Sequence, residues 1–149
     1  MLPYQTALRA SVAGLLVLGL AGCGTMRNTG EVVYEASLTG GQEVPPVTTT
    51  GRGTAVARLN PATNVLNYNV TFDRLTSATT GAHIHGPVPA GQNAGVLFPL
   101  TGNLAAPPLT GQATLTPEQV RQLAAGLMYV NIHTGQNPAG EIRGQLRPK

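Results

Sequence analysis

Alternate residues of the segment 66–73 are apolar, and the residues between them are polar or charged. Successive side chains of an extended strand point to opposite faces, so one face of this segment is suited to a core and the other to water. The alternation predicts a half-buried β-strand. Its core face consists of Leu66, Tyr68, Val70 and Phe72.

Shorter segments of the same kind recur along the chain, separated by loops rich in Gly, Pro and Asn. Many short strands with regular turn signals are typical of antiparallel β-sandwiches and barrels. We therefore predict an all-β fold, an antiparallel β-sandwich or barrel-like domain that spans residues 31–149. Further strands are predicted at 32–38, 54–59, 82–85, 96–98, 111–115, 127–133 and 141–146.

One short helix, at about residues 117–125, interrupts the strand pattern. Thr116 suits the N-cap, Pro117 suits the first helical position, and Gln119 completes a capping box. Gly126 is placed to end the helix. Because so short a helix is marginal in isolation, we expect it to pack against the sheet.

The composition excludes several classes of protein. Charged residues make up 10% of the chain and hydrophobic residues 42%, which argues against a disordered chain. The nine basic residues are scattered, the net charge is only +3 and aromatic residues are 4%. A nucleic-acid partner is therefore not expected, because such proteins carry clustered basic residues.

Residues 1–22 have the layout of an export signal. Arg9 precedes an apolar run over 12–20, which is too short to span a bilayer as a helix. The run ends in Leu20-Ala21-Gly22-Cys23, which resembles the lipobox of bacterial lipoproteins. The resemblance implies cleavage before Cys23 and lipidation of its thiol, and two or more acyl chains anchor a protein stably.

This signal sets the expected location. We expect a tether at residues 23–30, with the membrane as a partner through the lipid anchor. The protein is then placed in the bacterial cell envelope, and Gly24 after the lipidated cysteine favours the outer membrane, facing the periplasm or the cell surface.

All three histidines lie on predicted strands. His83 and His85 are separated by one residue, so a strand places both imidazoles on one face. His133 ends another strand, and a hairpin between strands 127–133 and 141–146 would place Glu141 near it. His83, His85 and His133 could hold one Cu or Zn ion, with Glu141 or water as the fourth ligand. Alternatively, the histidines belong to a structural polar network that hydrogen-bonds loop carbonyls.

Catalytic motifs are absent from the sequence. After signal cleavage no free thiol remains as a nucleophile, and no carboxylate pair has a spacing that calls for acid–base catalysis. No catalytic residue is therefore assigned. Asn131 and Arg143 share the polar strand faces with the histidines and are candidate binding residues. We interpret residues 40–46 as a loop that ends a strand.

Several segments together resemble the CHRD domain family, the module named after chordin. The resemblance spans about residues 31–147 and implies an extracytoplasmic β domain without a defined activity. Its segments are 36–46, 82–87, 115–116, 123–126, 129–134 and 137–146.

A weaker likeness concerns the copper-binding His-x-His of Cu/Zn superoxide dismutases, which His83-Ile84-His85 resembles. A binuclear site of that kind needs about six histidines and an aspartate, and this chain has three histidines. We expect a lipid-anchored envelope protein whose CHRD domain is a non-enzymatic binding or structural module. The alternative is a mononuclear Cu or Zn protein with superoxide-dismutase-like redox chemistry.

Overall fold

The computed structural model describes residues 30–149. The predicted signal segment, Cys23 and the tether up to residue 29 lie outside the described residues. No helix within residues 30–149 has the length and apolarity needed to cross a membrane.

The described chain forms one antiparallel sheet of nine strands with two short helical elements. The strand order is β5-β4-β7-β8-β1-β2-β3-β6, and β9 pairs with β1. The elements are β1 (Val32–Thr39), the 3₁₀ helix η1 (Gly40–Gln42), β2 (Arg52–Asn60), β3 (Val65–Asp73), β4 (Thr79–His85), β5 (Val96–Pro99), β6 (Leu109–Thr114), α1 (Pro117–Ala124), β7 (Tyr129–Thr134), β8 (Ile142–Gln145) and β9 (Arg147–Pro148).

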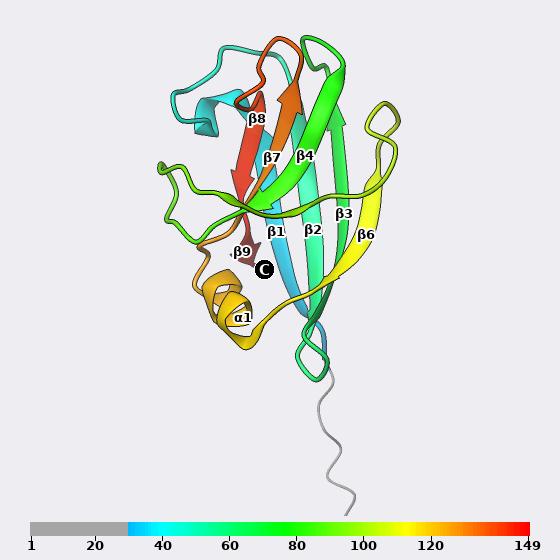
Figure 1. Cartoon of the computed structure of the whole chain (residues 1–149), viewed down its shortest axis with the longest axis vertical. Helices are drawn as coiled ribbons and strands as arrows, with labels where there is room; N and C mark the ends of the chain where they lie inside the picture. Colours follow the sequence, from blue (N-terminus) through cyan, green and yellow to red (C-terminus); the bar gives the residue numbers. More distant parts are fainter. Residues whose placement is uncertain (1–29) are drawn as a thin grey trace, which may run out of the picture.

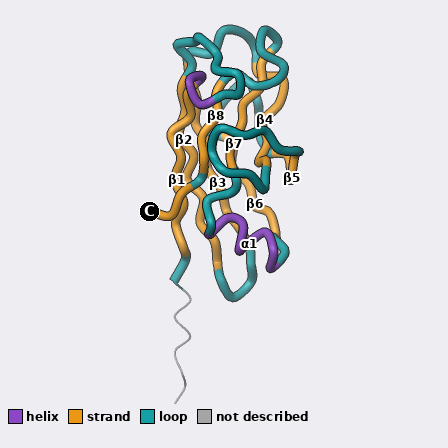
Figure 2. The backbone as a smooth tube through the Cα atoms, turned by 90° about the vertical axis from the view of Figure 1, so that its left-hand side faces the viewer, coloured by secondary structure: helices purple, strands orange, loops and turns teal. Residues whose placement is uncertain are grey.

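The sheet curls until its two edge strands, β5 and β6, approach each other. β4 and β7 lie in front of β1, β2 and β3, so the strands form a nearly closed barrel (Figures 1 and 2). Thr101, just after β5, bridges part of the remaining gap. Its backbone N–H donates to the Tyr68 hydroxyl on β3, and its own hydroxyl donates to the Thr110 carbonyl on β6.

The core fills the inside of this barrel, as the alternation predicts. Leu66 and Val70 on β3 are fully buried, and Ile84 on β4 and Ile132 on β7 are nearly so. The side chains between them point outward. The all-β barrel-like class is therefore confirmed.

The predicted helix is present as α1, which lies beside the lower end of the barrel in Figure 1. The Thr116 hydroxyl accepts from the Gln119 backbone, and the Gln119 side chain accepts from the Thr116 backbone. Leu123 buries its side chain completely. The described chain enters at this same end of the barrel, whereas the loops 40–51 and 135–140 lie at the opposite end (Figure 1).

Candidate functional site

The three histidines converge on the outer face of two neighbouring strands. β4 pairs antiparallel with β7, with Gly81 opposite His133 and His85 opposite Tyr129. The His83 and His133 rings are 4.9 Å apart between centroids, and the His85 ring lies 5.7 Å from His83 and 5.8 Å from His133. One ring nitrogen from each histidine lies within 4.8 Å of the other two. We call His83, His85 and His133 the histidine cluster.

Two of the three rings are held in a defined tautomer by backbone carbonyls. His85 Nδ1 is 3.0 Å from the Ala94 oxygen, and His133 Nδ1 is 3.0 Å from the Pro138 oxygen. Since a carbonyl only accepts, both Nδ1 atoms carry the proton and both Nε2 atoms keep a free lone pair. A hydrogen bond from the other ring nitrogen to a carbonyl is a usual way in which metal-binding histidines are oriented.

Three of the other four nitrogens of the cluster are buried without a partner. His85 Nε2, His133 Nε2 and His83 Nδ1 make no hydrogen bond. A buried polar atom that lacks a partner costs free energy, so the lone pairs on Nε2 of His85 and of His133 favour a group that accepts them. Burial also lowers the pKa of each of the three imidazoles, which keeps them neutral and able to act as ligands.

Gly81 makes room for the cluster. A Cβ atom at this position would stand 3.0 Å from Cε1 of His83 and 3.8 Å from Cδ2 of His133. Gly81 lies two residues before His83 on the same face of β4. Only a residue without a side chain allows the His83 ring to lie in this position beside His133.

Tyr129 and Arg143 extend the cluster into a stack. The rings of His85 and Tyr129 are 4.9 Å apart with 7° between their planes. The guanidinium carbon of Arg143 stands 3.5 Å from the centroid of the Tyr129 ring, a cation–π contact. Because β7 lies between β4 and β8, His85 and Arg143 flank Tyr129 from its two neighbouring strands.

The loop between β4 and β5 folds back over this polar face. Its Asn93 side chain accepts from Arg143, and the Gln92 carbonyl accepts a second, short bond from the same guanidinium. The Ala94 N–H donates to the Tyr129 hydroxyl. Farther along β8, Gln145 donates to the carbonyls of Val88 and Gly126. Arg143 is 2% exposed, so it serves as a buried support for this loop.

Asn131 connects the histidines with a second loop. It lies between Tyr129 and His133 on β7, and it donates to Glu43 over 3.5 Å. Glu43 is 5% exposed, and one of its oxygens has no partner. Burial raises the pKa of Glu43 to about 7, although the Arg143 charge and the Asn131 amide pull it down. Residues 40–46 therefore do more than end a strand, because they bury a carboxyl group against the polar face.

The structure does not bring Glu141 to the cluster. Its carboxylate accepts from the hydroxyls of Thr49, Thr76 and Thr134 at 2.7 Å each, from the Thr76 N–H and from the Asn137 amide. Thr134 follows His133 and faces the other side of β7, so the expected placement of Glu141 beside His133 is wrong. Burial alone would raise the pKa of Glu141, but these bonds outweigh burial and lower the pKa to about 2.

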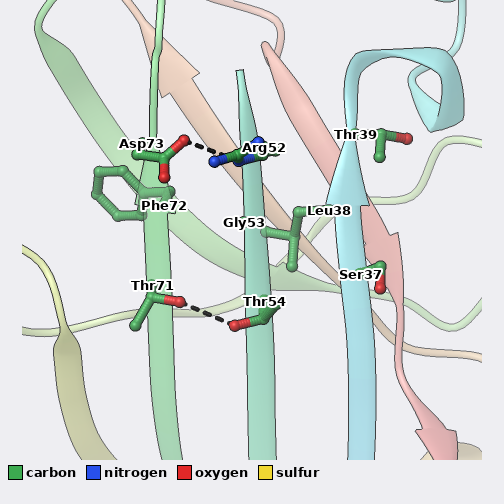
Figure 3. A pocket seen from close by; sticks show the side chains of 9 residues that line it. All are labelled: Ser37, Leu38, Thr39, Arg52, Gly53, Thr54, Thr71, Phe72 and Asp73. Carbon is green, nitrogen blue, oxygen red and sulfur yellow. Dashed lines mark hydrogen bonds and ion pairs between the residues drawn. The ribbon is translucent and has the colours of Figure 1, made fainter. Parts of the chain in front are cut away.

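A shallow hollow over β1, β2 and β3 is a weaker candidate for a site (Figure 3). Four of its polar side chains are paired with one another: Arg52 forms an ion pair with Asp73 at 3.1 Å, and the Thr54 and Thr71 hydroxyls are 2.8 Å apart. The Arg52 and Asp73 side chains are more than half exposed. Unlike the histidine cluster, this hollow presents no buried, unpartnered polar atom.

Sequence reasoning found the three histidines, Asn131 and Arg143, which the structure brings to one face. It missed the supporting groups: Gly81, the Glu43 carboxyl and the carbonyls of Ala94 and Pro138. Gly81 stands at even spacing from His83 and His85, but the predicted strand 82–85 begins one residue after it, whereas β4 begins at Thr79. The two carbonyls carry no sequence signal, because any residue supplies one.

These features define a small, barrel-like β domain with a covered histidine cluster on its outer face. The family model for the CHRD domain matches residues 34–146, and the chain belongs to this family. The match covers every residue of the cluster and of its supporting loops. No curated protein and no solved structure matches the chain significantly.

Proposed function

We propose that this protein is a lipid-anchored component of the bacterial cell envelope whose CHRD domain binds one transition-metal ion. The ligands are the unpartnered nitrogens of His83, His85 and His133. The observation that carries the proposal is the convergence of three imidazoles, each with a buried nitrogen that has no partner, and two of them oriented by backbone carbonyls.

Imidazole nitrogen suits copper and zinc. A metal–nitrogen bond is about 2.0 Å long, so three ligands around one ion lie roughly 3.3–3.5 Å apart. The nitrogens of the cluster, which lie within 4.8 Å of one another, reach this spacing by small side-chain rotations. A structural polar network alone does not account for three neighbouring imidazoles that each keep a buried nitrogen without a partner.

The position of the cluster in the barrel fits an anchored protein. The described chain enters at the end where α1 lies, and β7 runs away from that end (Figure 1). His133 is the penultimate residue of β7. His133 therefore lies toward the end of the barrel opposite the one at which the described chain enters. A binding role rather than a catalytic one is supported by the burial of the three nitrogens from solvent.

The experiment is a metal titration of the full chain, purified in detergent without a polyhistidine tag. Cu and Zn are titrated by calorimetry, and the metal content is measured by elemental analysis. We expect one ion per chain, and His83→Gln and His133→Gln should each weaken binding by more than about 100-fold.

Glu31→Gln is the control, because Glu31 is exposed and takes no part in the cluster. This variant should bind the ion as the unsubstituted chain does. Absence of binding, or binding that the histidine substitutions leave unchanged, would overturn the proposal. Mass spectrometry of the chain expressed in bacteria tests the anchor separately: lipidated Cys23 is expected at the N-terminus, and an unmodified Cys23 contradicts it.

A further inference from the structure

We propose that the ion preferred by the histidine cluster is monovalent copper, and that the buried guanidinium of Arg143 selects it against divalent copper and zinc. The inference rests on the proposed function, since it concerns which ion the same three ligands hold. It follows from the charges of the ligands and of the side chains around the cluster.

The ligand set itself is neutral. Within residues 30–149, the one group of potential ligand side chains that converges closely enough to share an ion contains imidazoles only. The nearby carboxylate of Glu141 is occupied by threonine hydroxyls on the other side of the hairpin. A divalent ion in this site would place two uncompensated positive charges away from water, whereas a monovalent ion would place only one there. Because uncompensated buried charge is costly, the neutral ligand set favours the monovalent ion.

A fixed positive charge stands beside the cluster. Arg143 is 2% exposed and forms no ion pair within the described part of the chain. One aromatic ring, that of Tyr129, separates its guanidinium from His85. The Arg143 charge repels a bound cation in proportion to the charge of that cation, so the repulsion is twice as large for a divalent ion.

The number of ligands also favours monovalent copper. Structural zinc sites are almost always four-coordinate. No fourth histidine, cysteine or carboxylate of the described residues joins the cluster, and three of its free nitrogens are buried from solvent. A three-coordinate arrangement is sufficient for monovalent copper. The sulfur ligands that often select this ion are absent from the cluster, so selection comes from charge and coordination number.

Glu43 provides an opposing charge. It is buried, and the Arg143 charge lowers its pKa although the two groups form no ion pair. At pH 8 its carboxylate partly offsets the field of Arg143. Removing Glu43 and removing Arg143 should therefore change the preference of the site in opposite directions.

The test measures the affinities of the full chain for Cu(I), Cu(II) and Zn(II) at pH 8. Each is obtained by competition with a chromophoric chelator, with Cu(I) handled anaerobically in the presence of ascorbate. We expect Cu(I) to displace equimolar Zn(II) from the unsubstituted chain. Displacement of Cu(I) by Zn(II) would overturn this inference and leave the proposed function standing, whereas no binding of any of the three ions would overturn both.

Substitutions then test the role of Arg143. Arg143→Gln should lower the ratio of Cu(I) to Cu(II) affinity by about tenfold, and Arg143→Lys should largely restore it. Glu43→Gln should raise the same ratio. If Arg143 only supports the loop, its loss weakens the binding of Cu(I) and of Cu(II) equally. An unchanged ratio of the two affinities would therefore overturn the selective role of Arg143. If Arg143→Gln fails to fold, the affinity ratio of Glu43→Gln is used instead. A Cu(I) to Cu(II) ratio that does not rise in this variant contradicts the inference.

Discussion

His85 lies face to face with Tyr129, with 7° between the ring planes and 4.9 Å between the centroids. The carbonyl of Ala94 holds the edge of the same imidazole at Nδ1, and the Ala94 N–H donates to the Tyr129 hydroxyl. Stacking fixes the plane of the ring and the carbonyl fixes its rotation. Together these two contacts aim Nε2 of His85 at the other two histidines.

Replacing Tyr129 should therefore weaken metal binding without removing a ligand. We expect Tyr129→Leu to lower the affinity for the bound ion about tenfold, because His85 loses its stacking partner and gains rotational freedom. Tyr129→Phe is the matched control: it keeps the ring and loses only the hydroxyl. Chelator competition measures both, and an equal loss in the two variants would assign the effect to the hydroxyl rather than to stacking.

Gly81→Ala should also weaken the site. The added Cβ would stand 3.0 Å from Cε1 of His83, a distance that forces the imidazole to move. We expect a loss of affinity of about tenfold or more with the fold intact. Gly41→Ala is the control, because a Cβ there meets no atom within 4 Å. Unchanged affinity in Gly81→Ala would show that the ring of His83 does not need this space.

The strand pattern was predictable because it depends on local periodicity. The alternation in β3 places Leu66 and Val70 inside, and the spacing of His83 and His85 places both rings on one face. The meeting of His83 with His133 depends on the pairing of β4 with β7, which joins segments about 50 residues apart. Sequence reasoning could propose that contact as a metal site, but the register that creates it came only from the structure.

Glu141 shows why the remainder of the site could not be predicted. Hairpin pairing suggested His133 as its neighbour, but Gly140 turns the chain with a φ of +135° just before it. The carboxylate then meets the hydroxyls of Thr49 and Thr76, which are 92 and 65 residues away in the sequence. Local alternation contains no information about partners at such separations.

The Glu141 carboxylate should make the fold sensitive to acid. Its pKa is about 2, below its ordinary value, so its contribution to stability is present above pH 4.5 and is lost as the pH falls towards 2. The full loss is on the order of 3 kcal/mol. Glu141→Gln should carry a comparable loss at pH 7 and a much smaller one at pH 2.5, as measured by urea unfolding. The exposed Glu31→Gln serves as the control, and a loss in Glu141→Gln that is independent of pH would contradict this account.

Glu43 should show the opposite dependence. Burial raises its pKa to about 7, so its contribution to stability is present below pH 4.5 and is lost as the pH rises through 7. Glu43→Gln keeps the shape of the side chain but cannot ionise. We expect the free energy of unfolding of Glu43→Gln, relative to the unsubstituted chain, to increase by about 3 kcal/mol between pH 4 and pH 8. Urea unfolding across this range, again with Glu31→Gln as the control, measures the difference. A difference that stays constant with pH would mean that the Glu43 carboxylate is stabilised in the fold as well as it is in water.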